Sequence, residues 1–540
     1  MQTPPSSYLL DRFISVRQLS KKAASPMPDH VTTASLDWAL AHTIRYGDTD
    51  IFPVPFEYQI IKAHWTYLRD HLAAVDLETH ELASATKLMV PKAGGGYRAA
   101  TQLDPLDSLL LSASLYEAAP QIESYRMGRA ERIACAFRVE SDTSGKLFSD
   151  DSGWKDYHDK TAELISSRRF RYVLCADISD YYNQASHHRI QGALSAAGVP
   201  EGRSKNLEQF LSRLNALHHS KGIPVGPTAG ILLGEACLAD VDVKLSRRHT
   251  HVRYVDDFRI FCETLDQADH AFHELAEYLF TAHRLSLHPT KTRILDVDTF
   301  AGEELFDPEQ SALETKRDRI SNILKRLVGD DYNDIDESAF DTSYLDKDIL
   351  RELFLRATGE SILNQSLARY ALRKAAALRS RVFIGDVIAN LEKLAPVYRD
   401  TVRFLLKVGD RKRPKEIGDA LVAIAKTSRI GFLPFIQIWT LQAFCEQPAL
   451  CTAGDALKIA EASHPNIRDR LSALVAKSYG MTDWIRERKE SWNSHGPWGH
   501  RAILWAASAL PHEERRHWLK SAQGHPLVLT RSVAKIAAST

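Results

Sequence analysis

The pattern of apolar and polar positions divides the chain into a mixed first part and a helical last part. Apolar and polar residues alternate over 252–254 and again over 258–260, which predicts two short half-buried strands joined by a tight turn. The apolar run 170–176 leads into Asp177 and predicts a third strand, with a helix-like segment after it. After Tyr344 the pattern becomes almost wholly helical.

Acidic residues lie at the ends of these predicted strands. Asp256 and Asp257 occupy the tip of the turn, where their charges repel unless water solvates them or a cation neutralises them. A solvated turn is the simpler interpretation, because Asp is a common turn residue. Asp177 supplies a third carboxylate, and the three could flank two Mg²⁺ ions about 3.5–4 Å apart, an arrangement that stabilises both reacting oxygens in phosphoryl transfer.

Two motifs that contain these residues resemble those of reverse transcriptases. Residues 254–257, Tyr-Val-Asp-Asp, are similar to the YxDD motif, and Asp177 with Tyr182 is similar to the motif that carries the first metal-binding Asp and an aromatic gate. The gate would leave no room for a 2′-hydroxyl and so favour dNTPs. The resemblance implies a binding set for two Mg²⁺ ions, with Mn²⁺ as the alternative, made of Asp177, Asp256, Asp257 and the backbone carbonyl of Ile178.

A glycine-rich hairpin is predicted upstream of these motifs. Residues 89–98 read as two strand ends joined by a Gly-Gly-Gly tip, with Lys92 and Arg98 on either side of it. Glycine lets the backbone approach a ligand, and the two cations would offer positive charge to a triphosphate, although such a loop is more often simply flexible. The position of the hairpin matches the fingers of the resembled family, where a Lys and an Arg hold the incoming nucleotide.

Two further segments resemble motifs of the same family. Residues 224–226, Pro-Val-Gly, stand where retroviral, group II intron and retron enzymes usually have Pro-Gln-Gly, and this departure resembles the abortive-infection (Abi) and defence-associated branch. The resemblance implies a nucleotide contact at Gly226, while the absent Gln puts template-directed fidelity in doubt. Lys291 matches a lysine that could protonate departing pyrophosphate, with a plain surface lysine as the alternative.

The last third carries a weak repeat and two minor candidate sites. Four prolines recur at intervals of 31 to 46 residues, each ahead of a predicted helix: Pro396, Pro434, Pro465 and Pro511. Because Pro is favoured in the first turn of a helix, this predicts a HEAT-like solenoid, similar to the C-terminal region of Abi-type reverse transcriptases. Residues 411–415 are either a phosphate patch or a loop charge cluster, and Arg488 with His495 has the spacing of a HEPN-nuclease motif.

The composition limits the classes of protein. The 540 residues hold 69 Lys and Arg and 69 Asp and Glu, so the net charge is zero. Neutrality disfavours a non-specific DNA coat protein and requires a local basic channel in any nucleic-acid enzyme. The six cysteines form no CxxC pair, which predicts reduced thiols, no structural zinc and a cytoplasmic location. No signal-peptide pattern or membrane-spanning run is present, which predicts no membrane association.

These observations predict an α+β right-hand polymerase with fingers and palm, followed by an all-α domain of HEAT-like repeats. The predicted segments are a flexible leader at 1–30, the fingers and palm at 31–305, a connector at 306–343 and the helical repeats at 344–540.

The resemblance implies a bacterial antiphage defence enzyme, an RNA-directed DNA polymerase whose synthesis could be template-independent and protein-primed. The expected partners are dNTPs, a DNA product that could be covalently attached, an RNA template or non-coding RNA, and further copies of the chain. One alternative is a template-directed reverse transcriptase that uses an associated non-coding RNA, as retrons do. Another is a catalytically silent RNA-binding scaffold, which would be expected to lack one of the three aspartates.

Overall fold

The protein forms two compact units, each built from segments that are separated in the sequence. The computed structural model describes residues 30–150, 153–215, 220–304, 347–359, 361–409 and 414–540. The predicted leader, apart from His30, the predicted connector 306–343 and residues 411–413 of the basic run lie outside the described residues. The first unit contains the described residues up to Gly47 together with Arg69–Leu82 and Leu106–Glu303; the second contains Asp48–Leu68, Ala83–Pro105 and the described residues after Glu304.

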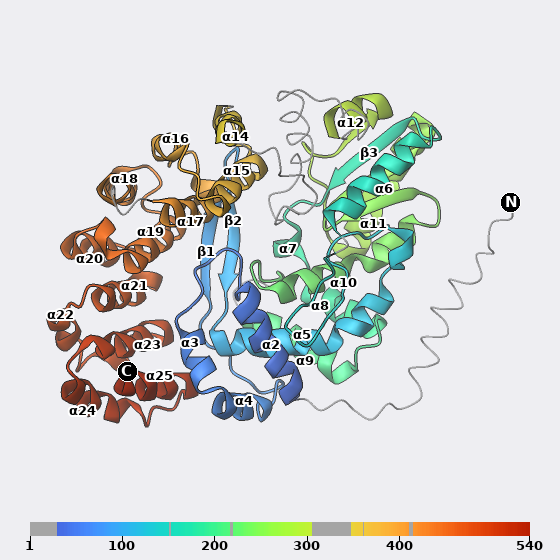
Figure 1. The fold of residues 1–540 in the computed structure, drawn as a ribbon. Coiled ribbons are helices and arrows are strands. Elements are labelled where there is room, and N and C mark those ends of the chain that lie inside the picture. The colour runs from blue at the N-terminus through green and yellow to red at the C-terminus, as the bar shows by residue number, and fades with distance from the viewer. Residues whose placement is uncertain (1–29, 151–152, 216–219, 305–346, 360, 410–413) are drawn as a thin grey trace. The chain divides into compact units, whose positions relative to one another are not determined.

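A four-stranded antiparallel sheet forms the centre of the first unit, in the order β4-β5-β3-β6 (Figure 1). Its strands are β3 (Tyr172–Asp177), β4 (Thr250–Tyr254), β5 (Asp257–Cys262) and β6 (Arg293–Asp296). The strands predicted on both sides of the acidic pair and before Asp177 are therefore confirmed. The predicted half-burial of the strands around the acidic pair is wrong, because every residue of β4 and β5 after the first is buried.

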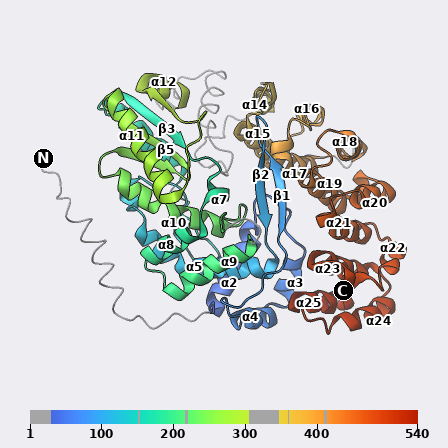
Figure 2. The same ribbon diagram turned by 180° about the vertical axis from the view of Figure 1, so that it is seen from behind.

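Helices on both faces of the sheet explain this correction. The helices of this unit include α2 (Thr33–Tyr46), α5 (Pro105–Tyr125), α6 (Trp154–Ser166), α7 (Tyr181–Gln184), α8 (His187–Ala196), α9 (Glu201–Leu214), α10 (Thr228–Leu245), α11 (Leu265–Tyr278) and α12 (Val297–Glu304). Of these, α6, α10 and α11 contact strands of the sheet. Helix α11 packs on β3 and β5, and α10 packs on β4 (Figure 2). On the opposite face, the Arg259 guanidinium lies 4.2 Å from the ring centre of Tyr157 in α6 and 5.1 Å from that of Phe300 in α12.

The second unit joins the glycine-rich hairpin to the C-terminal helices. Strands β1 (Thr86–Pro91) and β2 (Tyr97–Gln102) pair antiparallel, as predicted, and α3 (Glu57–Ala63) belongs to the same unit. Leu88, Val90 and Ala100 of the hairpin share one apolar core with residues of the C-terminal helices. The hairpin thus gains its hydrophobic support from residues that lie more than 240 positions later in the sequence.

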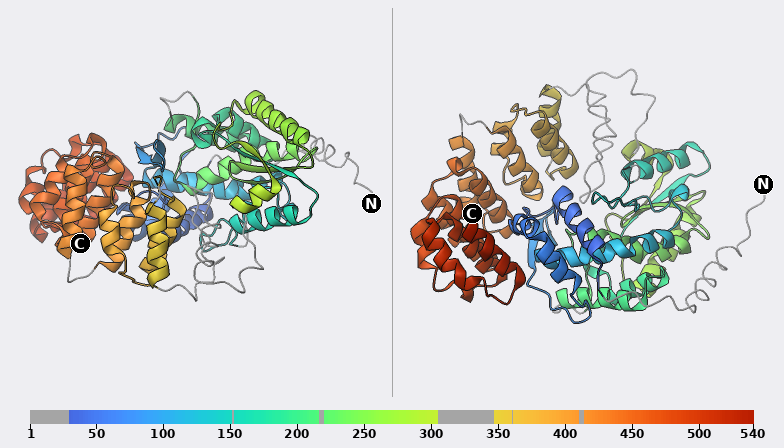
Figure 3. Two further views of the ribbon diagram at one scale, coloured as in Figure 1. Left: turned by 90° about the horizontal axis from the view of Figure 1, so that it is seen from above. Right: turned by 60° about the horizontal axis from the view of Figure 1, so that its bottom comes forward.

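The C-terminal part is wholly helical in the residues that are described. Its α-helices are α14 (Lys347–Gly359), α15 (Gln365–Ala377), α16 (Ile384–Ala389), α17 (Tyr398–Val408), α18 (Pro414–Thr427), α19 (Pro434–Glu446), α20 (Ala453–Glu461), α21 (Pro465–Ser478), α22 (Thr482–Glu487), α23 (Pro497–Ala506), α24 (His512–Ala522) and α25 (Val528–Ser539). Alternate helices pack on one another in the order α15, α17, α19, α21, α23, α25, and Figure 3 shows them following one another from yellow to red. Pro434 and Pro465 each begin a helix, as the proline pattern predicted.

A buried ion cluster links the early and late segments of the second unit. Arg470 Nη1 lies 2.7 Å from Glu57 Oε1, and Arg501 Nε lies 3.1 Å from the same oxygen. The second guanidinium also reaches Asp104 Oδ2 at 2.7 Å. Burial alone would raise the pKa of Glu57, but the charges of the two arginines lower it below its ordinary value. Two cations and two carboxylates therefore balance one another in this core.

Candidate active site

The three predicted carboxylates meet at one end of the sheet. Asp177 ends β3 and stands directly opposite Asp257, the first residue of β5, in the antiparallel register. Asp256 occupies the turn between β4 and β5, and its carbonyl oxygen accepts a hydrogen bond from the backbone N–H of Ile178 at 3.2 Å. Antiparallel pairing places residues that are 80 positions apart on one edge, as the spacing of the motifs required.

Lys291 lies beside these carboxylates. Its Nζ is 3.0 Å from Asp177 Oδ2, and its side chain is 59% exposed. The backbone around it is tied to the same strand, because the His288 N–H donates to the Asp177 carbonyl at 2.7 Å. The structure therefore brings together Asp177 and Lys291, the lysine that the sequence proposed as a proton donor.

The electrostatics of the site favour a cation. Burial, together with the negative charges of Asp177 and Asp257, raises the pKa of Asp256 to about 7, and Lys291 opposes part of this rise. Hard carboxylate oxygens that repel one another suit Mg²⁺, which binds through one or two carboxylates and takes its other ligands from water and substrate phosphates. Within the described ranges, no group of three or more His, Cys, Asp or Glu side chains is arranged so that it could hold a metal ion, the three aspartates included.

A buried arginine anchors the turn that carries the aspartates. Arg253 has 0% relative exposure, and its Nη1 donates to the carbonyl of Val255 at 2.7 Å. Val255 has φ of 54°, a left-handed conformation that is costly for a β-branched residue. The guanidinium also pairs with two carboxylates of α10, with Nη2 2.6 Å from Asp242 Oδ2 and 3.1 Å from Glu235 Oε2. These hydrogen bonds and ion pairs of Arg253 stabilise the strained turn.

The predicted gate and the Pro-Val-Gly segment are adjacent in the first unit. Tyr182 lies in α7, and its carbonyl accepts a hydrogen bond from the N–H of Ile223 at 2.7 Å. Its ring packs beside Gly234 of α10, where an added Cβ would stand 3.2 Å from Tyr182 Cε1. Gly226 has φ of 125°, which L side chains rarely adopt, so glycine is required there for backbone reasons alone.

Lys92 and Arg98 lie on the hairpin of the second unit. Gly94, Gly95 and Gly96 at its tip have φ of 74°, 96° and 89°, so the turn needs glycine at each position. The N–H of Lys92 donates to the carbonyl of Gly96 at 3.1 Å, which closes the turn. Both cations line a small pocket together with residues of α15 and α17.

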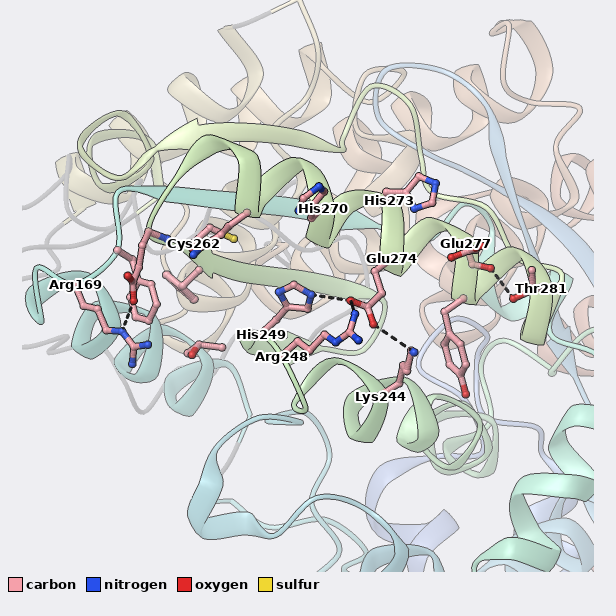
Figure 4. Close-up of a pocket in the computed structure, with 16 residues that line it drawn as sticks. Arg169, Lys244, Arg248, His249, Cys262, His270, His273, Glu274, Glu277 and Thr281 are labelled. Atoms are coloured by element: carbon pink, nitrogen blue, oxygen red, sulfur yellow. Dashed lines mark hydrogen bonds and ion pairs between the residues drawn. The ribbon is translucent and has the colours of Figure 1, made fainter. Parts of the chain in front are cut away.

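A hollow in the first unit lies away from the carboxylates. It encloses about 700 Å³ near Cys262, the opposite end of β5 from Asp257 (Figure 4). Its charged groups are largely paired with one another, since Glu274 lies 3.3 Å from Lys244 and 3.0 Å from His249. Because this hollow lies at the other end of β5 and its charged groups pair with one another, we assign it no role in chemistry at the carboxylates.

The two residues with the spacing of a HEPN-nuclease motif, Arg488 and His495, both contact other side chains of the C-terminal part. Arg488 stacks over the ring of Trp484 at 3.5 Å, and His495 pairs with Asp469 at 2.7 Å. His187 is buried and is hydrogen-bonded to Ser212 and to the carbonyl of Gly222. The six cysteines are free, and no described helix is long and apolar enough to cross a membrane.

Sequence reasoning missed Arg253 as the anchor of the turn, and it missed three arginines of the C-terminal helices that line the hairpin pocket, Arg369, Arg373 and Arg399. The signal for the first was present, because a charged residue in a five-residue strand beside Asp256 needs a partner if both faces are covered. The other three carry no motif, and only the packing of distant segments reveals them.

A comparison with protein-family models agrees with the motifs. Residues 91–312 match the family model described as reverse transcriptase (RNA-dependent DNA polymerase). No curated protein matches the chain. Among solved structures, an apo telomerase from Candida tropicalis is 10% identical with a TM-score of 0.33, covering 71% of this chain and 74% of that one. A telomerase from Candida albicans bound to the TWJ fragment of telomeric RNA is 12% identical with a TM-score of 0.30, covering 74% and 65%.

Proposed function

We propose a specific role for this RNA-directed DNA polymerase, whose reverse transcriptase domain spans residues 91–312: it is a bacterial antiphage defence enzyme of the Abi type. It polymerises dNTPs, with Asp177, Asp256 and Asp257 and the Ile178 carbonyl as ligands of two Mg²⁺ ions. The observation that carries the chemistry is the register that sets Asp177 opposite Asp257, with Asp256 in the adjoining turn.

Each residue of the site has a defined part in nucleotide transfer. When bound, two Mg²⁺ ions would stabilise the attacking and leaving oxygens as the new O–Pα bond forms and the bond to pyrophosphate breaks. Lys291, 3.0 Å from Asp177, protonates the departing pyrophosphate. The ring of Tyr182 screens the 2′ position of the sugar, and the backbone at Gly226 contacts the nucleotide. Lys92 and Arg98 hold the triphosphate.

Val225 supports synthesis without a conventional template. Its side chain is apolar and 6% exposed, so it cannot supply the amide that Pro-Gln-Gly enzymes place in the nucleotide pocket. The priming group is then a hydroxyl of the protein, which leaves the DNA covalently attached. The row of C-terminal helices, proposed as HEAT-like repeats, would carry the product or a neighbouring copy of the chain.

The first test is synthesis by the purified protein with Mg²⁺ and labelled dNTPs, without template or primer. The proposal predicts labelled DNA that enters a denaturing gel freely only after protease treatment. The Asp257→Asn variant serves as the control and should give no product. Label that is free before protease, or label that depends on an added primer, contradicts protein priming.

The description of the matching family as RNA-dependent favours one alternative, a template-directed enzyme that uses an associated non-coding RNA. It predicts product only when RNA and primer are supplied. Protection of cells against phage tests the biological role under either mode of synthesis. If cells carrying Asp256→Ala with Asp257→Ala resist phage as well as the wild type, polymerisation is not the basis of defence.

A further inference from the structure

A basic pocket lies within the second unit, between the glycine-rich hairpin and the C-terminal helices. We call it the basic pocket, and its five cationic residues are Lys92, Arg98, Arg369, Arg373 and Arg399. The first two come from the hairpin, the next two from α15, and the last from the start of α17. The three segments are brought together by the apolar core that the hairpin shares with these helices.

Positive charge exceeds negative charge in this pocket. Its acidic residues are Asp50 and Asp400. Asp400 is buried and already paired, with Arg373 Nε 3.0 Å from Oδ1 and Arg369 Nε 3.6 Å from Oδ2. Burial lowers the pKa of Arg369, Asp400 and Asp50 oppose this effect, and the nearby cations Arg373 and Arg98 add to it. Like charges at this proximity are costly unless an anion joins them.

The buried cluster of Glu57, Asp104, Arg470 and Arg501 provides a comparison from the same unit. That cluster holds two cations and two carboxylates in direct contact, as a purely structural ion network does. The basic pocket holds five cations against two carboxylates. The lining of the basic pocket therefore carries more positive than negative side chains, whereas the buried cluster holds equal numbers of each.

Arg399 has hydrogen-bonding capacity to spare. Its Nε is shielded from solvent and has no hydrogen-bond partner within the described ranges. A buried guanidinium donor without an acceptor is costly, and an oxyanion with several acceptor oxygens would satisfy it. The pocket encloses only about 40 Å³, which suits one phosphate group and excludes a nucleobase.

We infer that the basic pocket binds a phosphate group, with Arg399, Arg369 and Arg373 of the C-terminal helices acting beside Lys92 and Arg98 of the hairpin. The phosphate belongs either to the triphosphate of a nucleotide or to the backbone of a nucleic acid, and this assignment rests on the proposed polymerase function. The C-terminal helices are then part of the substrate-binding surface as well as the support of the hairpin.

The test compares two single substitutions on α17 of the full-length protein. Arg399→Gln removes one cation from the pocket, whereas Lys407→Gln removes one exposed cation of the same helix outside the pocket. Binding of inorganic tripolyphosphate is measured by calorimetry, and binding of a labelled twelve-nucleotide oligo-dT by fluorescence anisotropy. Both use Mg²⁺-free buffer with EDTA, so neither measurement depends on polymerase activity.

Arg399→Gln should weaken at least one probe by about tenfold, while Lys407→Gln changes neither by more than about twofold. Loss confined to tripolyphosphate assigns the site to nucleotides, and loss confined to oligo-dT assigns it to the nucleic-acid backbone. Equal effects of the two substitutions, or no binding of either probe by the wild type, overturn the inference.

Two more variants separate this inference from folding and from the proposed function. Arg399→Lys keeps the charge but loses the two-pronged guanidinium, so it should bind with intermediate affinity and fold as the wild type does. Asp257→Asn should abolish DNA synthesis without changing the affinity for tripolyphosphate. If the wild-type protein makes no DNA but binds phosphate in a way that depends on Arg399, the proposed function is wrong and the phosphate-binding site is still supported.

Discussion

Replacing Arg253 by methionine is the most informative perturbation of the active site. The substitution keeps the apolar stem but removes the guanidinium that pairs with Asp242 and Glu235 and holds the Val255 carbonyl. Glu235 retains Arg126, whose Nη2 lies 2.6 Å away. Within the part of the chain that the structure describes, Asp242 keeps His251 alone as a charged partner, at 3.4 Å, so most of the cost falls on this one buried carboxylate.

The expected loss of unfolding free energy is about 3–5 kcal/mol, the usual cost of removing one partner from a buried ion pair. Burial raises the pKa of Asp242, but Arg253 outweighs burial and holds it below the ordinary value. Without the arginine the folded-state pKa should rise, so the loss should be smaller at pH 5 than at pH 8. Urea unfolding at pH 5 and at pH 8 measures this loss of unfolding free energy.

The turn should also lose its catalytic position. A displacement of the aspartates by about 1 Å can lower the rate by about 100-fold, so Arg253→Lys, which keeps the charge, should reduce kcat more than it raises KM for dNTPs. Arg247→Met is the matched control, because Arg247 is exposed and its loss should change stability by less than about 0.5 kcal/mol. The reasoning is refuted if Arg253→Met unfolds at the same urea concentration as this control.

The remaining predictions concern catalysis, pH and the second unit. Asp257→Asn should reduce nucleotide incorporation by about 1000-fold, and Lys291→Ala by about 100-fold with a flattened alkaline limb of the pH profile, both measured in steady-state assays. Burial raises the pKa of Asp48 to about 7, so its stabilising contribution is complete below about pH 4 and is lost as the pH rises to 7. Asp48→Asn should therefore be more stable than the wild type by up to about 4 kcal/mol at pH 8 and equally stable at pH 4. An equal difference at both pH values would contradict this account. Arg501→Met should cost about 3–5 kcal/mol, seen as a lower urea midpoint, because it leaves Glu57 and Asp104 underpaired; an unchanged midpoint would be inconsistent with a buried cluster.

The catalytic edge could be predicted from sequence because its determinants are local. Alternation around the Asp256–Asp257 pair specifies two strands and a turn, and an apolar run ending in Asp177 specifies a third. Lys291 was expected from its resemblance to a motif lysine of reverse transcriptases, and the structure places its Nζ 3.0 Å from Asp177 Oδ2.

Interactions between distant segments could not be predicted. Arg253 stands at the alternation phase expected to face solvent or a polar layer, and only the carboxylates of α10 explain how both faces of β4 are buried. The partner of the glycine-rich hairpin was equally hidden, because nothing in residues 86–102 points to α15 or α17. A single sequence carries no direct signal for the pairing of Asp104 with Arg501 across 397 positions.

That separation has a consequence for synthesis on the ribosome. At about 5–20 residues per second, Arg501 is made about 20–80 s after Asp104. During this interval the hairpin residues Leu88, Val90 and Ala100 lack the helices that cover them in the finished protein. A nascent chain released early would present this apolar surface to chaperones or to other nascent chains, so the yield of active enzyme should depend on translation speed through the last third of the message.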